Sequence, residues 1–582
     1  MTPPHARYIR AARAADVREA GCLAVNVDGH AVALFSSGGQ VFAVDNRCPH
    51  MGFPLDRGTL KDGILTCHWH HARFDLATGG TFDQFAGDVR AFPVEIRGGD
   101  VWVDVAPHGD AREADRARLR DGLERNIPLV LAKAVIALLD AEHDPAAPFR
   151  LGLEFGVRYR QPGWGPGLTI HTCMVNLLPH LAADDRPRAL HHGLSAVARD
   201  CDGMPPRFAL RPLPTPAGGL PSLTRWFRQF VEVRDAEGAE RCVVSAVHAG
   251  ADPRQLAEML FAAATDHRYL QTGHVLDFTN KTLEALDAAG WEHAAPVLSS
   301  LIPGYAAAER MEEANEWRHP VDLVAVLEGA FEALPAALEA GRDRRGEWAG
   351  RDALVPILLG EDPEAIAGAL VQALRDGCAE PALGDVVAYA AALRIARFHT
   401  SNEFGDWDTA LHTFTFANAV RQALRRASSP ELLRGVFDAA MSVYLDRFLN
   451  VPAAPLPEPP REETADPSLL LHELSMVLDR QQQVNEAGGI TARYLGTGAD
   501  PARLLAVLGA LLLREDRDFH TIQMVEAAFR LYPDLAGTPL GPHVLVAAAR
   551  YLGAHSPTVR AQGQTFGIAQ RLHRGERLYE SS

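Results

Sequence analysis

The 582-residue chain has no run of eighteen apolar residues and no apolar core at its N-terminus. We therefore expect neither a membrane-spanning helix nor a secretory signal. Positive charge is also in deficit, because 57 Lys and Arg residues stand against 74 Asp and Glu residues, for a net charge of −17. This balance argues against nucleic acid or an anionic membrane surface as a partner. Only seven cysteines occur, five of them without a pairing pattern, which is typical of a cytoplasmic protein.

Several common catalytic motifs are missing as well. The glycines of "GPGLTIH" and "GTGAD" lack the preceding strand and the spacing of a dinucleotide fingerprint, and neither has the Gly-Lys-Ser/Thr of a phosphate loop. No Gly-x-Ser-x-Gly elbow, paired Cys-x-x-Cys motif or Cys-x-x-Cys-His haem attachment site occurs. Metal ligation is therefore the chemistry that the sequence itself indicates.

Potential metal ligands are concentrated in residues 46–80. Cys48-x-His50 is followed by sixteen residues and then by Cys67-x-x-His70, so two loops each offer one thiolate and one imidazole. Such ligands hold either zinc or a [2Fe–2S] centre in which two His replace two Cys on one iron. Zinc modules usually pair ligands two to four residues apart and place both His late. One Cys and one His in each loop favours the two-iron cluster, whose irons are chemically different.

These loops and their flanks resemble the Rieske family, in particular the small ferredoxins and ferredoxin-like domains of oxygenase and nitrite-reductase systems. The resemblance covers roughly residues 7–105, in which "HAVALFSSGGQVFAVDN" and "VRAFPVEIRGGDVWVDV" predict hairpins with glycine turns. It implies that Cys48 and Cys67 hold one iron and that His50 and His70 hold the other. It also implies an NAD(P)H-dependent reductase or a ferredoxin as the electron donor.

The resemblance also predicts the kind of cluster. High-potential respiratory members carry a second Cys in each loop, joined as a disulfide, and a hydroxyl near the cluster. Here those places are Phe53, Trp69 and Ala72. Because fewer hydrogen bonds reach the sulfurs, we expect a potential toward the low end of the Rieske range of about −150 to +300 mV. We interpret His68 and His71 as rim residues near the point where electrons enter.

After residue 105 the sequence changes to Ala, Leu, Arg and Glu at helical spacing, punctuated by Pro and Gly. The predicted fold class is multidomain α+β, with an N-terminal all-β Rieske domain at 1–106 and then a large all-α domain of repeated helical units. We place the two repeat halves at 107–345 and 346–582, with a proline-rich loop or linker at 451–467. One helix is predicted from Pro320 to Gly341.

Two similarities suggest the repeat. Asp-Pro pairs open "ADPRQLAEML", "EDPEAIAGAL" and "ADPARLLAVL" in one frame, and the first and last pairs lie 248 residues apart. The stretch around His171 can be laid over that around His412 at an offset of 241. Asp-Pro is also an ordinary N-cap with Pro at the first helical position, and Asp466-Pro467 fits that simpler explanation. The similar offsets favour a duplicated helical unit.

Six histidines of the helical part are candidates for a catalytic or metal-binding role. They are His171, His267, His274, His399, His412 and His520. Taken singly, a His on an apolar helix is more often a hydrogen-bonded core residue than a ligand. Equivalent positions in stacked units can converge on one cavity, so the alternative is an inward-facing group that holds an additional non-haem iron.

The helical part resembles the questin-oxidase-like family of helical oxygenases through "YLQTGHVLDFTNKTLEAL" and "LHTFTFANAVRQALRRASSPELLRGVFDAAMSVYL". This resemblance implies oxygen-dependent oxidation of a small organic substrate and assigns no catalytic residue. Ring-hydroxylating Rieske oxygenases hold iron with two His and a carboxylate, residue types that "DHRYLQTGHVLD" contains. Its spacing differs from theirs and their catalytic domain is rich in strands, so we do not assign the helical part to them.

Three functions are compatible with this organisation. The one we favour is an oxidoreductase in which the cluster feeds electrons to a substrate or oxygen site in the helical domain. The second is a ferredoxin-like carrier whose helices form a docking scaffold for a separate enzyme. The third is a regulatory protein whose cluster senses redox state. Iron in excess of the cluster, together with oxygen consumption, would distinguish the first from the others.

Overall fold

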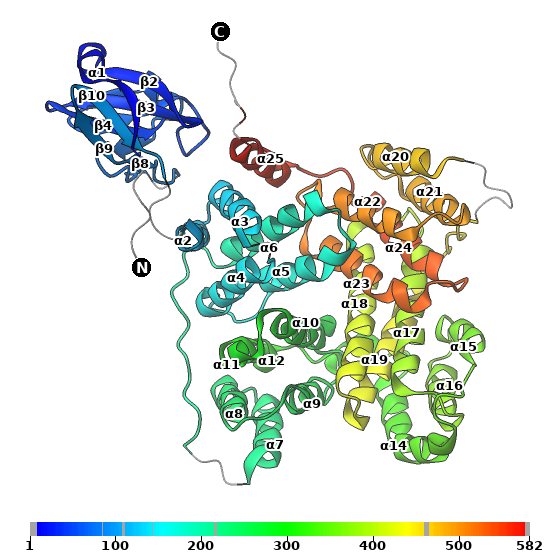
Figure 1. Cartoon of the computed structure of the whole chain (residues 1–582). Coiled ribbons are helices and arrows are strands. Elements are labelled where there is room, and N and C mark those ends of the chain that lie inside the picture. Colours follow the sequence, from blue (N-terminus) through cyan, green and yellow to red (C-terminus); the bar gives the residue numbers. More distant parts are fainter. Residues whose placement is uncertain are drawn as a thin grey trace. The chain divides into compact units, whose positions relative to one another are not determined.

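The structure is a computed structural model (Figure 1). It describes residues 8–83, 85–106, 111–142, 144–214, 218–458, 465–574 and 576. The chain divides into two compact units, the first made of residues 1–148 and 564–582 and the second of residues 149–563. No helix of the described residues is both long and apolar enough to cross a membrane.

The β domain of the first unit contains three antiparallel sheets. Their strand orders are β1 (Tyr8–Arg13), β10 (Asp100–Asp104), β9 (Val94–Arg97); β2 (Cys22–Val27), β3 (His30–Ser37), β4 (Gln40–Asp45), β8 (Ala91–Phe92); and β5 (Thr59–Lys61), β6 (Ile64–Thr66), β7 (Arg73–Asp75). Two short helices, α1 (Ala14–Ala20) and η1 (Leu55–Arg57), complete the domain. Glycine pairs with positive φ, at 38–39 and 98–99, form the turns of the β3–β4 and β9–β10 hairpins. Both predicted hairpins are confirmed.

Side chains alternate between the two faces of each strand, and the inward-facing ones form a core directly beneath the predicted cluster loops. Phe35 of β3, Leu65 of β6 and Phe74 of β7 are buried together with Cys48 and Cys67. Side chains on one face of a strand point the same way, so strands of two sheets contribute to one apolar cluster. The two loops that carry the predicted ligands therefore rest on a common, rigid base.

Helices also belong to the first unit. They are α2 (Ala111–Glu124), α3 (Pro128–Glu142) and most of α25 (Ala561–His573). Ile136 of α3 packs against Phe566 of α25 in a small apolar cluster. The amine of Lys133, on α3, donates hydrogen bonds to the carbonyl oxygens of Pro49 and His50, the latter at 3.2 Å. The first unit thus continues beyond residue 106, the boundary that the change in composition suggested.

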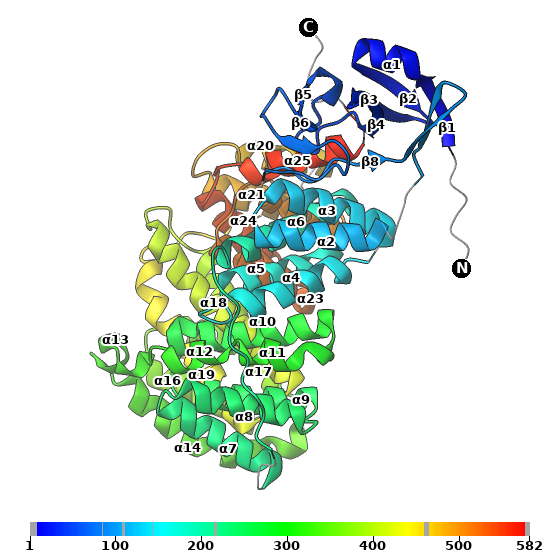
Figure 2. The ribbon, with the colours of Figure 1, turned by 90° about the vertical axis from the view of Figure 1, so that its left-hand side faces the viewer.

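The described residues of the second unit form helices and connecting loops without strands, which confirms the predicted change from a β domain to a large helical region. The longer helices are α4 (Ala146–Tyr159), α5 (Pro166–Leu177), α6 (Arg186–Asp200), α7 (Gly219–Glu232), α8 (Ala236–His248), α9 (Pro253–Ala264), α10 (His274–Ala289), α14 (Leu323–Gly341), α15 (Arg351–Leu358), α16 (Pro363–Arg375), α17 (Glu380–Ala396), α18 (Phe404–Arg426), α19 (Pro430–Leu445), α20 (Pro467–Val477), α21 (Val484–Gly496), α22 (Pro501–Leu513), α23 (Phe519–Leu535) and α24 (Gly541–Ala554). Short helices include η4 (Leu270–Gly273), α11 (Ala294–Ser299), α12 (Ile302–Ala307), η6 (Met311–Glu313), α13 (Asn315–Arg318) and η8 (Asp446–Asn450). Antiparallel neighbours such as α7 and α8 lie side by side in both views (Figure 2).

The Asp-Pro signals open helices as expected. Asp252, Asp362, Asp466 and Asp500 are each an N-cap whose carboxylate accepts a backbone N–H, with Pro at the first helical position. The helix predicted from Pro320 begins later, at Leu323. Its N-cap is Asp322, because the Asp322 carboxylate accepts the N–H of Ala325 at 3.0 Å.

Two other predicted boundaries are those of the loop or linker at 451–467 and of the repeat halves at 345/346. Residues 451–458 contain no helix or strand, in keeping with the predicted loop, whereas residues 459–464 lie outside the described residues. Residues 345 and 346 both belong to the second unit. The two repeat halves stay a prediction.

Candidate functional site

Two loops of the β domain bring the four predicted cluster ligands together. The N–H of Cys48 donates to the Phe53 carbonyl and that of Cys67 to the Ala72 carbonyl, both at 2.8 Å, so each loop closes into a tight turn. The two thiols are 3% and 1% exposed and hydrogen-bond to each other. The ring centroids of His50 and His70 lie 4.8 Å apart, with His70 exposed. The cysteines thus lie inside the domain and the histidines at its edge.

The electrostatics of these residues fit metal ligation. Burial, with the neighbouring His70 and Lys133, lowers the pKa of His50 to about 4, so its imidazole is neutral. Its Nδ1 atom is buried and has no hydrogen-bond partner among the described residues. The hydrogen bond between the thiols lowers the pKa of Cys67 to about 6 and raises that of Cys48. A thiol that readily ionises and a neutral imidazole nitrogen without a partner are suitable donors for a [2Fe–2S] centre with mixed ligands.

Aromatic and histidine side chains surround this site. The Trp69 ring lies 4.7 Å from that of His70 and 6.0 Å from that of Phe53, measured between centroids. His68 and His71, the predicted rim residues, are both exposed. All seven cysteines are free, so neither loop contains a disulfide. The low potential expected from the sequence stays a prediction.

A small antiparallel β domain whose two loops present Cys-x-His and Cys-x-x-His over one core defines an iron–sulfur electron-transfer domain. The family model of the Rieske [2Fe-2S] domain matches residues 7–93. Through this domain the chain belongs to the Rieske family.

The known proteins similar to the β domain include ferredoxins. The ferredoxin component of the p-cumate 2,3-dioxygenase system from Pseudomonas putida is 36% identical over 96 residues, which are 16% of this chain and 81% of the relative. The ferredoxin component of the naphthalene 1,2-dioxygenase system from the same species is 30% identical over 101 residues, 17% of this chain and 97% of the relative. The solved Sphingomonas yanoikuyae B1 ferredoxin is 29% identical, covering 17% of this chain and 100% of its own, with a TM-score of 0.17. The N-terminal domain is thus homologous to ferredoxin components of dioxygenase systems and has an electron-transport role.

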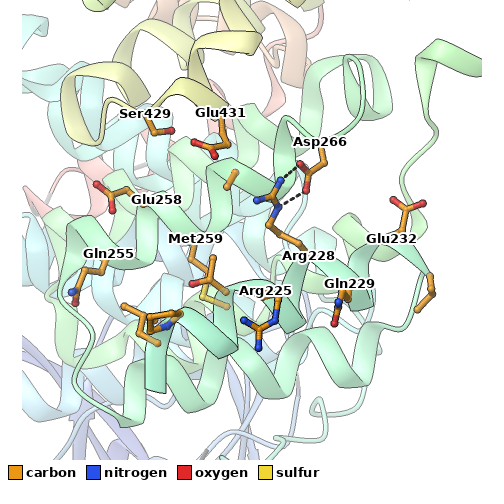
Figure 3. Close-up of a pocket in the computed structure, with 15 residues that line it drawn as sticks. Arg225, Arg228, Gln229, Glu232, Gln255, Glu258, Met259, Asp266, Ser429 and Glu431 are labelled. Atoms are coloured by element: carbon orange, nitrogen blue, oxygen red, sulfur yellow. Dashed lines mark hydrogen bonds and ion pairs between the residues drawn. The ribbon is translucent and has the colours of Figure 1, made fainter. Parts of the chain in front are cut away.

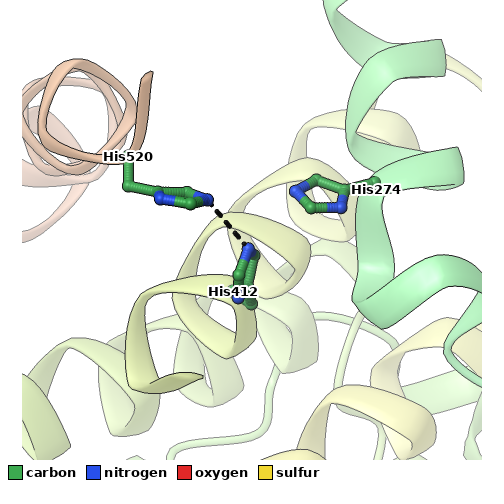
Figure 4. Close-up of side chains that lie close together, drawn as sticks. All are labelled: His274, His412 and His520. Atoms are coloured by element: carbon green, nitrogen blue, oxygen red, sulfur yellow. Dashed lines mark hydrogen bonds between the residues drawn. The ribbon is translucent and has the colours of Figure 1, made fainter. Parts of the chain in front are cut away.

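In the second unit, three of the six candidate histidines converge (Figure 4). His274 is the first residue of α10, His412 lies two turns into α18, and His520 is the second residue of α23. The His412 and His520 Nε2 atoms are 3.1 Å apart, and one ligand nitrogen from each ring lies within 4.8 Å of the others. We call these residues the three-histidine group. Each of its members is partly exposed.

The distances and protonation states of the three-histidine group suit a metal ion. Nitrogens bound to one metal at about 2.0–2.2 Å stand about 3.0–3.4 Å apart, so the His412–His520 separation already fits and His274 would move inward by roughly 1 Å. Burial, together with the neighbouring histidines, lowers the pKa of His274 to about 4 and that of His412 to about 3. Both rings are therefore neutral at physiological pH and keep a lone pair for a metal.

Neighbouring groups orient two of the three rings. The Asp408 carboxylate lies 3.4 Å from His520 Nδ1 and accepts the Tyr551 hydroxyl at 2.6 Å. A proton on His520 Nδ1 leaves Nε2 free to bind a metal. His274 hydrogen-bonds to the Gln271 backbone, while its Nε2 is buried without a partner among the described residues. In both residues Nε2 is thus the ring nitrogen whose lone pair is available to a metal.

A strained segment fixes the position of His274. Tyr269, Gln271 and Thr272 have φ of 45°, 51° and 51°, values that are rare outside glycine. Gly273, with φ of 88°, has no room for a side chain, because a Cβ would lie 2.8 Å from Phe416. Such backbone strain persists only where surrounding structure over-determines it, and it is frequent at functional sites.

The other three candidate histidines lie elsewhere. His171 is fully buried in α5, with Nε2 2.9 Å from the Phe149 carbonyl oxygen. His267 lies between the carboxylates of Glu232, at 2.7 Å, and Glu312, at 2.5 Å. His399 is partly exposed, and its Nδ1 accepts the N–H of Ser401 at 3.1 Å. Local hydrogen bonds account for each of these residues, and none joins the three-histidine group.

Two cavities adjoin the three-histidine group. The first, of about 190 Å³, is lined by His274 together with Trp164, Phe278, Leu301, Gly304 and Tyr305, and we call it the α12 cavity. The second, of about 380 Å³, is lined by His412 together with Tyr269, Trp317, Leu445, Asp446 and Phe448, and we call it the η8 cavity. The larger of the two falls within the range of roughly 300–1,000 Å³ that small-molecule sites occupy.

A larger cavity, of about 1160 Å³, lies apart from the histidines between α7, α9 and the start of α19 (Figure 3). Its lining carries both charges, and the Arg228 guanidinium pairs with the Asp266 carboxylate, with Nε 2.7 Å from Oδ2. Among the described residues, the metal-ligating side chains that lie close enough to share an ion are those of the three-histidine group, and none of them lines this cavity. Size alone therefore does not identify the reactive site.

Sequence reasoning missed the residues that support the three-histidine group. Asp408 precedes His412 by four residues, which places the two on one face of α18. That spacing was a usable signal. No sequence signal pointed to Asp446 or Tyr551, because only the packing of η8 and α24 brings these residues near the group.

Proposed function

We propose that this protein is an oxidoreductase in which the Rieske cluster supplies electrons to a mononuclear non-haem iron held by His274, His412 and His520. The observation that carries the proposal is the meeting of three imidazoles from three helices, next to a cavity large enough for a small organic molecule. A histidine group with room for further ligands is suited to iron that activates dioxygen. When bound, iron would supply Lewis acidity and one-electron redox chemistry.

In this proposal Cys48 and Cys67 ligate one iron of the cluster, and His50 and His70 ligate the other. The exposed edge at His70 is where a partner would exchange electrons, because the cysteine side is buried. An NAD(P)H-dependent reductase or a ferredoxin is the proposed donor. The relatives support it, because they are ferredoxin components of dioxygenase systems.

The chain's own residues have definite tasks around the proposed iron. Asp408 and Tyr551 hold the His520 ring in one tautomer. The strained turn before α10 aims His274. Asp446 lines the η8 cavity and is 5% exposed, and its Oδ2 has no hydrogen-bond partner among the described residues. It is therefore available to hold a polar group of the organic substrate.

The proposed reaction class balances as a monooxygenation. An organic R–H, dioxygen, two electrons and two protons give R–OH and water. A cluster carries one electron at a time, so two reductions of the cluster serve each turnover. NAD(P)H, through the reductase, is the source of both electrons.

A second candidate function is electron carriage alone, with the helical unit acting as a docking scaffold for a separate enzyme. It is favoured by the relatives, which are ferredoxin components that span the β domain and not the helical region. In that case the protein would contain cluster iron only. The three-histidine group would then be structural, with His412 hydrogen-bonded to His520 and His274 packed beside them.

The test is the iron and acid-labile sulfide content of anaerobically purified protein, with His412→Ala as the variant and His399→Ala as the control. We expect iron in excess of sulfide in the natural protein and in the control. In His412→Ala we expect equal iron and sulfide with an unchanged Rieske EPR signal. Equal iron and sulfide in the natural protein, after reconstitution with ferrous iron, would refute the proposal and favour the carrier.

A further inference from the structure

The α12 cavity and the η8 cavity reach the three-histidine group by different residues. His274 lines the α12 cavity and His412 lines the η8 cavity, and neither histidine lines both. A reaction between dioxygen and an organic molecule needs a place for each reactant. The two cavities differ in size and in the unpaired buried polar atoms that they offer, and these differences indicate which reactant each one admits.

Most of the lining of the α12 cavity is apolar, and its buried side-chain donors are already paired. Half-buried Gln271 also lines the cavity, and its Oε1 accepts the Glu309 N–H at 3.1 Å. The Trp164 indole N–H donates to the Thr169 hydroxyl at 2.9 Å, and the Tyr305 hydroxyl pairs with that of Thr279 at 2.7 Å. His274 Nε2 is the only buried side-chain polar atom of the described lining without a partner, and it is the proposed iron ligand. A polar molecule would lose its hydrogen bonds to water on entering such a space, whereas a small apolar molecule would lose nothing.

The η8 cavity is twice as large and has a polar contact to offer. Asp446 Oδ2 is buried without a partner among the described residues, so a ligand that hydrogen-bonds there would satisfy it. Burial raises the pKa of Asp446 to about 7, against hydrogen bonding from Thr413. Tyr269, Trp317 and Leu445 supply apolar walls. These features suit an organic molecule with one polar group.

We propose that the α12 cavity is the dioxygen site, through which dioxygen reaches the His274 side of the three-histidine group while the organic substrate occupies the η8 cavity. This inference rests on the proposed function. A third cavity, of about 300 Å³, lies beyond Asp408 and is lined by charged side chains that include Arg517 and Asp518. Charged walls favour water over an apolar gas, so that cavity is the less suitable route.

Gly304 makes the inference testable without strain. It lies in α12, it lines the α12 cavity, and a Cβ added to it would meet no atom within 4 Å. Gly304 and Ala307 are both exposed, so a leucine at the first position or a phenylalanine at the second would occupy the open side of the cavity. Gly368 provides the matched control. It lies in α16, it is exposed, and its added Cβ also meets nothing, but it does not line the cavity.

The first measurement needs no iron. Crystals of the full chain are pressurised with xenon, which binds in dry apolar cavities. We expect xenon between α10 and α12 in the natural protein and in Gly368→Leu, and none there in Gly304→Leu or Ala307→Phe. A natural protein without xenon in the α12 cavity would overturn the inference.

The second measurement uses nitric oxide as a dioxygen analogue and follows its binding to the ferrous protein by stopped-flow absorbance and EPR. Filling the α12 cavity should slow association by about tenfold in Gly304→Leu and Ala307→Phe and leave Gly368→Leu unchanged. If both variants bind iron outside the cluster and this iron binds nitric oxide as fast as in the natural protein, the dioxygen route is refuted and the proposed function is not. A protein without iron outside the cluster would refute the proposed function as well.

Discussion

Replacing Asp408 by Asn should weaken iron binding at the three-histidine group without unfolding the helices. The carboxylate lies 3.4 Å from His520 Nδ1 and also accepts the Tyr551 hydroxyl at 2.6 Å. An amide of the same shape keeps the packing but removes the negative charge that makes His520 a stronger donor. Groups that orient a metal-bound histidine in this way typically contribute 10–100-fold in affinity, so we expect a loss of about 1.4–2.7 kcal/mol.

The assay is competition of a calibrated chelator for the second iron, followed under anaerobic conditions. His399→Ala is the control, because His399 is a partly exposed histidine whose hydrogen bonds are to Ser401 of its own loop. His412→Ala should lose the iron outright, because it removes a ligand. If Asp408→Asn binds iron as tightly as the natural protein does, the assignment of His520 Nε2 as a ligand oriented by Asp408 is wrong.

Three further predictions concern other parts of the chain. Lys133→Met removes a cation beside the first cluster loop, and losing this positive charge makes reduction of the cluster less favourable. A redox titration should therefore give a midpoint potential lower by about 20–60 mV. An unchanged midpoint potential would exclude the contact in solution. Gly273→Ala places a side chain at φ of 88°, and urea unfolding should show a loss of about 1–3 kcal/mol; a fully stable variant would contradict the strain argument. Hydrogen bonding to Glu312, then Glu232, raises the pKa of His267, so its stabilising effect is complete below about pH 6.5 and lost as pH rises through the raised value. His267→Gln should therefore reduce the urea midpoint near pH 6 and not near pH 9; equal losses at both would refute this linkage.

The cluster loops were predictable because their chemistry is local in sequence. Cys48 and His50 are two residues apart, and Cys67 and His70 are three apart, so each short turn brings its own pair together. Glycine pairs marked the hairpins on either side. What the sequence left open was Lys133, because a contact between residues 83 positions apart has no local signal.

The histidines of the helical unit were a harder case. The six candidates share residue type and helical surroundings, yet three converge and three are bound by local partners. A regular spacing does connect α10 to α23. Besides the histidines, Asp277 meets Gln523 and Lys281 meets Glu526, at separations of 246 and 245 residues. These separations lie between the two offsets noted in the sequence, 241 and 248, and the duplication stays a prediction.

The sequence by itself determined the cluster motif, the change from strands to helices and the N-caps at which many helices begin. These features depend on neighbours within a few residues, and the backbone makes such contacts in nearly any compact arrangement. Only the tertiary structure decided which histidines meet, that Asp408 orients one of them, and that two cavities of different size adjoin the group. Those relations join positions more than one hundred residues apart, and packing between helices, which no local pattern encodes, fixes them.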